Sequence, residues 1–484
     1  MKKIFTIALA AVALLSSCSK DFLTKEPALA QSDVLTLSTF EGIDKAVAGA
    51  YAPLASTSWY CGDFILSNEM RTMNGKRWVQ FTRYNSGRYL EDYSVNFTAT
   101  NTSGVWSYGY YVILSANSAI AALDNVEAPE QDKNNVKAEA LFLRALSHFD
   151  LVRTFAQPYN YTADASHLGV PVVLTVDSEA KPERSTVKVV YQQIIDDLLE
   201  AEKIIDPSYS RKGVTDATAS ANINSIRALL SRVYLYSEQW QKAADYATLV
   251  INSGKYKMWT PDQVASIKDG EFSSVFTQDV PAEGEVIFEV YENLSQSYGG
   301  GNENVCGMTS FNGYGDCGAS KDLLNLYEPK DVRGLLVMPD YDGNALFTMK
   351  YFGKGLSSID ANNTIVLRLS EMYLNRAEAL INGASIPGAT ALGDLETVAK
   401  NRNASVQPAT KSGVYAERAK ELAWEGHLWF DLARTGRAMT RKDVSGTQVP
   451  TSIEPKDYRW AMPIPDREFT VNPNLVQNDG YNKY

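Results

Sequence analysis

The sequence has few of the side chains that enzymes commonly use for proton transfer and metal binding. Only 3 of its 484 residues are histidine and only 4 are cysteine. The histidines lie far apart, and neither two cysteine pairs nor a His-x-x-x-His spacing is present, so a zinc site is not expected. No Walker A, Gly-x-Ser-x-Gly or His-Glu-x-x-His string occurs. The sequence therefore contains no signature of nucleotide-dependent, serine-dependent or zinc-dependent chemistry.

Clustered positive charge and long hydrophobic runs are also scarce. The chain has 46 basic and 57 acidic side chains, a formal net charge of −11, and no basic block. Nucleic acid is not an expected partner, because the neutralisation of phosphates requires clustered Lys and Arg. No apolar run reaches the roughly 20 residues that a membrane-spanning helix requires. With 45% apolar residues, the chain is expected to be globular.

The first eighteen residues have the pattern of a lipoprotein export signal. Two lysines precede an apolar run over residues 4–15, and the sequence Leu-Ser-Ser-Cys ends at Cys18. This order is typical of a signal peptide rather than of a transmembrane helix. We expect a signal peptide over residues 1–17, lipidation of Cys18 in a lipobox, and a polar lipidated tether over residues 18–37. Several acyl chains would give stable anchoring to a membrane; the alternative is an ordinary secretory signal with an incidental cysteine.

The three other cysteines bear on a Gly-rich loop. An exported chain can form disulfides. Cys306 and Cys317 flank the loop with ten residues between them, and a bridge there would add roughly 3 kcal/mol of stability. Three cysteines cannot all pair internally, so a Cys306–Cys317 disulfide and two unbridged thiols are the alternatives, and Cys61 is expected to stay free.

Most of the chain has helical periodicity. Apolar residues recur three and four positions apart in three blocks, residues 38–56, 104–255 and 363–437. Within the middle block, Tyr234 lies nine residues before Ala243, a spacing that resembles a tetratricopeptide unit, where a small residue at a helix crossing lets a large ring pack over it. Because similar strings recur, we predict a mainly α fold with a tetratricopeptide-like scaffold of about four helix pairs.

Two long insertions lack this periodicity. Residues 57–103 and 256–362 are rich in Gly, Asn and aromatic residues, and the clearest strand candidate is residues 286–291. Such long excursions from a helical array are usually functional or form a subdomain. We therefore expect one domain over residues 38–484 with loop-rich, ligand-binding insertions and a Pro-rich C-terminal segment, residues 438–484.

Three glutamates recur at four-residue spacing. Glu417, Glu421 and Glu425 would share one face of the helix expected over residues 414–434. Acid/base catalysis on glycosides needs two carboxyl groups facing each other across a cleft, which neighbours on one helix do not provide. Since buried charges persist only when paired, we instead expect ion pairs with scaffold arginines. The candidate partners are Arg368, Arg376, Arg402 and Arg434.

The composition of the two insertions suits a carbohydrate ligand, because sugars present apolar C–H faces ringed by hydroxyl groups. For any single ring the alternative is the protein core, where aromatic residues dominate burial. For the two insertions together we favour a binding face, with Trp78 as the first choice because Lys76, Arg77 and Gln80 flank it. The ligand-binding candidates are Trp59, Tyr60, Asn68, Arg71, Trp78, Tyr84, Tyr291, Tyr298, Phe311 and Tyr314.

Several strings resemble the SusD/RagB family of outer-membrane nutrient-binding lipoproteins, and the resemblance extends over nearly the whole chain. One departure is Asp479, where the family usually has proline. The most specific strings are Glu417-Arg418, Glu421-Leu422, Trp424-Glu425-Gly426, Trp429-Phe430-Asp431-Leu432, Arg434-Thr435-Gly436 and Pro463-Ile464-Pro465.

The resemblance implies a non-catalytic, lipid-anchored protein on the cell surface of the outer membrane. Such a protein captures an oligosaccharide, or in some members a peptide, and delivers it to a SusC-like TonB-dependent transporter on which its helical scaffold rests. No cofactor is implied. Bound calcium is compatible with the Asp and Asn residues of the loops, although no spaced calcium loop is present. A surface glycoside hydrolase and a protein-binding helical-repeat adaptor are the remaining alternatives.

Overall fold

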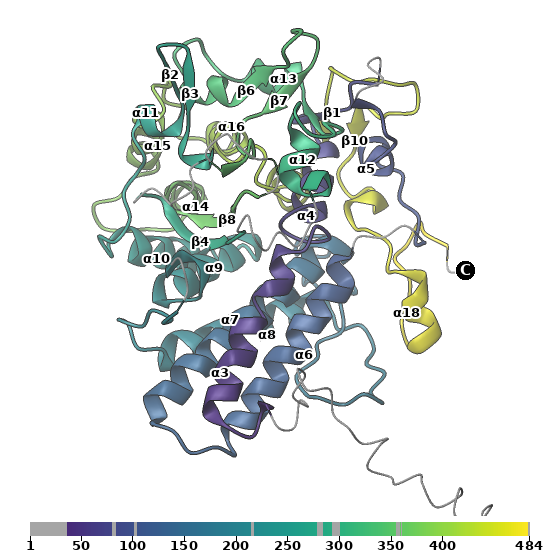
Figure 1. The fold of residues 1–484 in the computed structure, drawn as a ribbon, viewed down its shortest axis with the longest axis vertical. Helices are drawn as coiled ribbons and strands as arrows, with labels where there is room; N and C mark the ends of the chain where they lie inside the picture. The colour runs from purple at the N-terminus through teal and green to yellow at the C-terminus, as the bar shows by residue number, and fades with distance from the viewer. Residues whose placement is uncertain are drawn as a thin grey trace, which may run out of the picture.

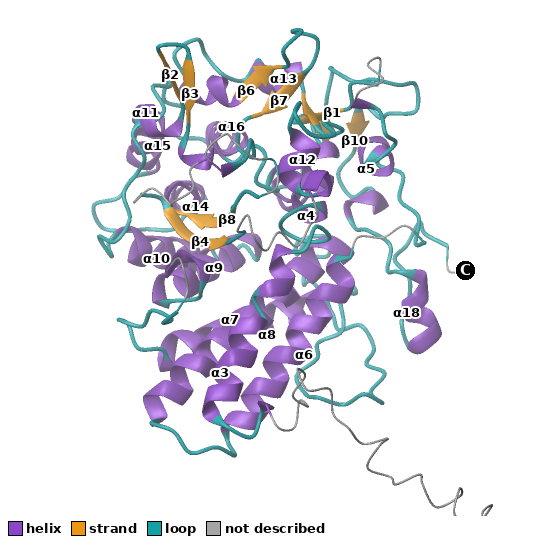
Figure 2. Cartoon of the chain, viewed as in Figure 1, coloured by secondary structure: helices purple, strands orange, loops and turns teal. Residues whose placement is uncertain are grey.

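The computed structural model describes most of the chain beyond the N-terminal tether. The described residues are 36–79, 84–100, 104–213, 217–277, 284–292, 301–354, 359 and 361–482. In this part the chain is mainly helical, and its strands are short (Figure 2). None of the described helices combines the length and hydropathy that a bilayer span requires. The expected signal peptide, Cys18 and Tyr298 lie outside the described residues.

Four helices form the lower part of the molecule in Figure 1. They are α3 (Phe40–Gly49), α6 (Val105–Leu123), α7 (Glu130–Phe155) and α8 (Val187–Ile204). α7 is the central helix, because α6 packs on one side of it, α8 packs on another, and every residue from Ala138 to its end is buried. α3 begins after Thr39, whose hydroxyl accepts a hydrogen bond from Gly42 N at 3.2 Å.

The array continues upward in Figure 1 through five further helices. They are α9 (Ile223–Tyr236), α10 (Trp240–Ile251), α14 (Leu369–Ile381), α15 (Ala391–Lys400) and α16 (Lys411–Glu421). α8 contacts α9, α9 contacts α10, α10 contacts α14, and α14 contacts both α15 and α16. Neighbours in space thus follow chain order, with one long insertion between α10 and α14. The chain is mainly α with a helical array, as predicted.

The crossing of α9 and α10 matches the predicted spacing. Tyr234 and Ala243 are both buried, at 1% and 0% exposure. Ser231 Oγ donates a hydrogen bond to the backbone oxygen of Ala243 at 3.0 Å, so the two helices approach closely where the small residue lies.

The first insertion is less irregular than expected. α4 (Asp63–Met70) is a helix within residues 57–103, and seven of its eight residues, Phe64 to Met70, are buried. Because Ser67, Asn68 and Glu69 are buried together with the apolar residues, α4 has no amphipathic period for the sequence to reveal. Short helices follow in both insertions and near the C-terminus: α5 (Leu90–Ser94), α11 (Pro261–Val264), α12 (Val305–Thr309), α13 (Lys321–Leu324) and α18 (Asp466–Val471).

The helix expected over residues 414–434 is in fact two helices. α16 ends at Glu421, and α17 (Leu428–Arg434) begins after a turn. Trp424 and Gly426 in this turn have φ values of 63° and 76°, in the left-handed region that a continuing helix does not use. Glu425 therefore does not extend the helix face of Glu417 and Glu421.

A small sheet joins the two insertions. β1 (Gly75–Lys76) of the first insertion pairs with β5 (Gly318–Ala319) of the second, and the sheet has the order β1-β5-β7-β6. β6 (Val337–Pro339) and β7 (Leu346–Thr348) form an antiparallel hairpin at its other edge. Two further hairpins are β2 (Ser266–Lys268) with β3 (Glu271–Ser273), and β9 (Met439–Thr440) with β10 (Ser452–Ile453).

A separate strand pair connects the second insertion to the array. β4 (Val286–Val290) agrees with the expected strand, and it pairs antiparallel with β8 (Thr364–Arg368), which leads directly into α14. Both strands are buried throughout, so their apolar residues contribute to the core on both faces.

A buried network of ion pairs surrounds Glu421. The carboxylate of Glu421 binds Arg368 at 2.6 Å, Arg402 at 2.7 Å and Arg333 at 2.9 Å. Burial by itself would raise the pKa of Glu421, but the three guanidinium groups hold it well below its usual range. The members of this Glu421 network, all buried, are Glu285, Asp331, Arg333, Lys350, Arg368, Arg402, Glu417, Glu421 and Glu425.

The network confirms the expected pairing of the three glutamates with arginines, with changes in the partners. Arg368 and Arg402 are partners as expected, and Arg333 and Lys350 of the second insertion join them. Two expected partners pair elsewhere: Arg376 binds Asp394 at 2.6 Å, and Arg434 binds Glu378 at 2.6 Å. The catalytic interpretation of these glutamates loses support, because each is held by a buried cation.

Glu421→Ala is expected to lower the free energy of unfolding by about 3–5 kcal/mol, because it leaves buried guanidinium groups without their counter-ion. Urea denaturation measures this loss. The matched control is Glu41→Ala, which removes a carboxylate from an exposed ion pair with Lys45 at 2.7 Å and is expected to leave the midpoint nearly unchanged. Equal effects of the two substitutions would contradict a stabilising role of the network.

Candidate functional site

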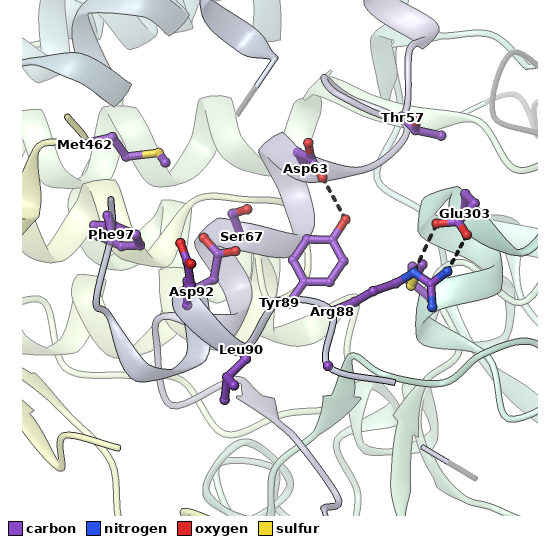
Figure 3. Close-up of a pocket in the computed structure, with 13 residues that line it drawn as sticks. Thr57, Asp63, Ser67, Arg88, Tyr89, Leu90, Asp92, Phe97, Glu303 and Met462 are labelled. Carbon is purple, nitrogen blue, oxygen red and sulfur yellow. Dashed lines mark hydrogen bonds and ion pairs between the residues drawn. The ribbon is translucent and has the colours of Figure 1, made fainter. Parts of the chain in front are cut away.

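A cavity of about 450 Å³ opens where the two insertions meet. Most of its lining comes from α4, from the segment around α5, and from the region of α12 (Figure 3). Its volume lies within the range of small-molecule sites, about 300–1,000 Å³. The lining residues are Thr57, Asp63, Ser67, Gly87, Arg88, Tyr89, Leu90, Glu91, Asp92, Phe97, Glu303, Met308 and Met462.

Tyr89 and Asp63 form the fixed polar pair of the cavity. Tyr89 has a left-handed backbone, with φ of 55°, directly before α5. Its hydroxyl donates a hydrogen bond to Asp63 Oδ1 at 2.8 Å, as Figure 3 shows. Burial, helped by the nearby Asp92 carboxylate and opposed by Tyr89 and Arg71, raises the pKa of Asp63 to about 6. The Asp63 carboxyl group therefore changes charge close to neutral pH.

Arg88 bridges the two insertions at the cavity. Its guanidinium group binds both carboxylate oxygens of Glu303, at 2.5 Å and 3.2 Å (Figure 3). The same group lies 4.3 Å from the centroid of the Tyr314 ring and 3.9 Å from the Asp316 carboxylate. Arg88 is thus committed to the second insertion and not available to neutralise Asp63.

Asp92, in contrast to Asp63, has its own cation. Arg71 Nη2 lies 2.7 Å from Asp92 Oδ1, and the Arg71 guanidinium lies 4.4 Å from the centroid of the Phe97 ring. Among the described residues, no Lys or Arg lies within ion-pair distance of Asp63. The cavity consequently holds one largely buried carboxyl group with a tyrosine hydroxyl as its partner and no counter-ion.

An aromatic platform lies on the second insertion next to the cavity, and it consists of Phe311, Tyr314 and Tyr341. Tyr341 is 76% exposed, and its ring packs edge-on against Phe311 with 4.7 Å between centroids. The Tyr341 hydroxyl donates a hydrogen bond to Asn312 Oδ1 at 3.1 Å, which fixes the ring orientation. Tyr314 is 37% exposed and contacts Arg88 at the cavity. The platform thus exposes the rings of Tyr341 and Tyr314 to solvent, and Phe311 supports Tyr341.

Most ligand-binding candidates of the first insertion are instead part of the core. Trp59 and Tyr60 are buried, and both donate hydrogen bonds to Asp150 Oδ2, at 2.9 Å and 2.7 Å. Asn68 is buried and donates to the backbone oxygen of Phe64 at 2.6 Å, whereas Arg71 is buried against Asp92. Their polar groups have partners inside the protein, so their designation as ligand contacts was wrong.

Trp78, the first choice, is also buried, at 3% exposure. Its indole nitrogen donates to the backbone oxygen of Leu346 at 3.3 Å, and Lys76 Nζ lies 4.1 Å from the ring centroid. The flanking charges did not mark a surface position, because Lys76 is paired with Asp443 and Arg77 donates to Asn85 at 2.9 Å. Tyr84 is likewise buried and donates to Asp340 at 3.0 Å.

The ligand-binding candidates of the second insertion differ from one another in exposure. Tyr291 is half-buried beneath Lys354, whose Nζ lies 4.0 Å from the ring centroid. Phe311 is 7% exposed and supports Tyr341 rather than facing solvent, so it is not itself a contact surface. Tyr314 is exposed beside the cavity and stays a prediction.

The predicted site residues did not include Asp63, Arg88, Tyr89 or Tyr341. For Tyr341 a signal was available, because it lies in the sequence Pro-Asp-Tyr-Asp-Gly, which is typical of a tight turn and therefore of an exposed side chain. For Asp63 and Arg88 no local signal exists, since their roles depend on contacts between distant segments.

Of the two alternatives for Cys306 and Cys317, the structure has the unbridged thiols. Both side chains are buried thiols, and no disulfide joins these two described residues. The loop between them is already held by backbone hydrogen bonds, from Gly315 N to Gly307 O at 3.2 Å and from Cys317 N to Met308 O at 3.0 Å. Among the described residues, no group of three His, Cys, Asp or Glu side chains could hold a metal ion, so the calcium hypothesis finds no support there.

Comparisons with known proteins match SusD-type proteins over most of the chain. Residues 21–235 match a family model described as starch-binding associating with outer membrane, and residues 344–481 match the SusD family model. SusD-like protein P2 of Formosa agariphila is 27% identical over 504 residues, which cover 92% of this chain and 93% of that protein.

Two solved structures extend the comparison. A SusD superfamily protein from Bacteroides thetaiotaomicron has a TM-score of 0.79 at 30% identity, covering 91% of this chain and 99% of that chain. Surface glycan-binding protein A from Bacteroides thetaiotaomicron has a TM-score of 0.72 at 19% identity, and the match covers 92% of this chain and 100% of that chain. At this identity the match shows a shared fold alone. The helical fold shared with these structures thus places the chain in a SusD-like class of protein. The chain belongs to the SusD/RagB family.

Glu69 on α4 makes the stability of this region depend on pH. Its carboxylate oxygens accept hydrogen bonds from Gly426 N and from Asn74 Nδ2, both at 2.7 Å. Burial raises the pKa of Glu69 to about 7. Because the folded protein holds this proton more tightly than the unfolded chain, the contribution of Glu69 to stability is full below pH ~4.5 and is lost as pH rises through ~7.

Glu69→Gln is therefore expected to reduce the loss of stability between pH 5 and pH 8 by roughly 2 kcal/mol relative to wild type. Asn74 Oδ1 has no partner among the described residues, so a flip of that amide lets it accept a hydrogen bond from the glutamine. Chemical denaturation of both proteins at the two pH values measures the difference. Parallel pH dependences of the two proteins would show that Glu69 titrates as an ordinary carboxyl group.

Proposed function

We propose that this protein is a non-catalytic, lipid-anchored protein of the outer-membrane surface that binds an oligosaccharide and delivers it to a SusC-like TonB-dependent transporter. Family membership supports this, since the matching model is described as starch-binding and associated with the outer membrane. The lipobox pattern at Cys18 supports the anchor.

The observation that carries the proposal is the exposed, oriented ring of Tyr341 on the second insertion, which together with the first insertion lines the cavity. Apolar C–H faces of a sugar can stack on this ring, and Tyr314 continues the surface toward Arg88. Because Phe311 and Asn312 hold Tyr341 in place, stacking costs little additional side-chain entropy. Capture thus needs binding surfaces and no bond-breaking group.

Tyr341→Ala is expected to weaken oligosaccharide binding about tenfold, because truncation of an anchoring aromatic residue costs about 1–2 kcal/mol. Isothermal titration against a panel of oligosaccharides and peptides identifies the ligand and then measures the effect. The matched control is Tyr111→Ala, which removes a ring of 58% exposure from α6.

An equal loss in both variants, or binding of peptides only, would contradict the assigned site or the carbohydrate ligand. Sustained release of products from the same oligosaccharides would contradict the non-catalytic assignment. In that event the protein would act as a surface glycoside hydrolase.

Cys18→Ala is expected to release the protein from membranes, because it removes the residue that would carry the acyl chains. Fractionation of cells that express the variant, with Cys61→Ala as the control, measures the change. The buried Cys61 thiol has no role in anchoring, so that variant is expected to stay in the membrane fraction. Retention of the Cys18 variant would contradict the lipobox assignment.

A further inference from the structure

The geometry of the cavity points to a ligand that carries a positive charge. Accepting the proposed function, we propose that the captured glycan contains an unacetylated amino sugar, whose ammonium group binds Asp63 inside the cavity between the insertions.

The charges of the cavity lining are unbalanced. Four carboxylates, those of Asp63, Glu91, Asp92 and Glu303, face one guanidinium group, that of Arg88. Arg88 is paired with Glu303, and Asp92 is paired with Arg71 from outside the lining. Within the part of the chain that the structure describes, Asp63 and Glu91 are left without an ion pair. An ammonium group supplies the missing charge.

Asp63 is held by a hydrogen bond, and no Lys or Arg of the described residues forms an ion pair with it. It lies in the first turn of α4, and its Oδ1 accepts the hydroxyl hydrogen of Tyr89 at 2.8 Å (Figure 3). A largely buried carboxylate without a counter-ion is costly, and the rise of the pKa of Asp63 to about 6 through burial reflects that cost. Binding of a cation therefore stabilises the ionised form of Asp63.

The rest of the lining favours an organic cation over a metal ion. The described residues contain no group of three acidic, His or Cys side chains placed to hold a metal. Phe97, Met308 and Met462 give the cavity apolar surface, which suits the C–H face of a sugar ring. A hydrated metal ion would gain nothing from that surface.

The cavity borders the aromatic platform at Arg88. Arg88, in the lining, contacts the Tyr314 ring, and Tyr314 is three residues from Phe311, which packs against Tyr341. On the proposed arrangement, one unit of a glycan chain occupies the cavity while another part of the chain stacks on the platform. On this arrangement the platform supplies affinity for sugars in general, and Asp63 selects the amine.

Isothermal titration at pH 7 with β-1,4-linked glucosamine tetramer and with the N-acetylglucosamine tetramer tests the proposal. The amine-bearing tetramer is expected to bind at least tenfold more tightly. Asp63→Asn keeps the size of the side chain and an oxygen that accepts from Tyr89, and it is expected to abolish this preference. Asp164→Asn, a substitution at an exposed aspartate outside the lining, is the matched control and is expected to preserve it.

The pH profile of the wild-type protein provides a second measurement that does not depend on a variant. The groups that act on Asp63 are Tyr89, Asp92 and Arg71. Because Asp63 must be ionised to bind an ammonium group, affinity for the glucosamine tetramer is expected to fall about tenfold per pH unit below pH ~6. Affinity for the acetylated tetramer is expected to stay constant.

The outcomes separate this inference from the function on which it rests. Equal affinity for the two tetramers, an unchanged preference in Asp63→Asn, or no binding of the glucosamine tetramer would overturn the inference. Should neutral oligosaccharides still bind and depend on Tyr341, the proposed glycan-binding function would stand. Asp63-dependent binding of a lysine-containing peptide, without binding of any glycan, would overturn both.

Discussion

The buried Glu421 network is the interaction on which the architecture depends. Glu421 in α16 binds Arg368, the last residue of β8 before α14, and Arg333 of the second insertion; all three side chains are buried. A charge in such a site is tolerated only while its partners stay in place, so the network fixes the second insertion on the helical array. The β1–β5 pairing then positions the first insertion on the second, and the cavity lies where the two meet. The array thus carries insertions in which hydrogen bonds orient Asp63 and Tyr341.

Much of this fold could be predicted, because the signals are local. The helices of the array show their apolar period, and the spacing of Tyr234 and Ala243 indicates the close crossing of α9 and α10. The pairing of Glu417 and Glu421 with arginines follows from the cost of burying charge. The family strings around the turn at Trp424 are specific, and the comparisons confirm the family.

The ligand site could not be predicted in the same way, because burial is decided by residues distant in sequence. Trp78 has polar neighbours, yet Lys76 is neutralised by Asp443, which lies far along the chain. Trp59 and Tyr60 are retained in the core by Asp150 of α7. α4 shows no amphipathic period, because its polar residues are buried together with its apolar ones. The raised pKa of Asp63 arises from its burial in the folded protein, which no neighbouring residue in the sequence indicates. Among these residues only Tyr341 had a local signal of exposure, because its sequence is typical of a tight turn.

Hydrogen exchange with and without a saturating oligosaccharide tests the central claim most directly, since it locates the binding face without a substitution. We expect protection of backbone amides in residues 84–97, 301–316 and 340–345, which contribute to the cavity and the aromatic platform. The amides of α6 and α8 are expected to exchange at unchanged rates. Protection confined to the helical array, with none in the insertions, would contradict the account.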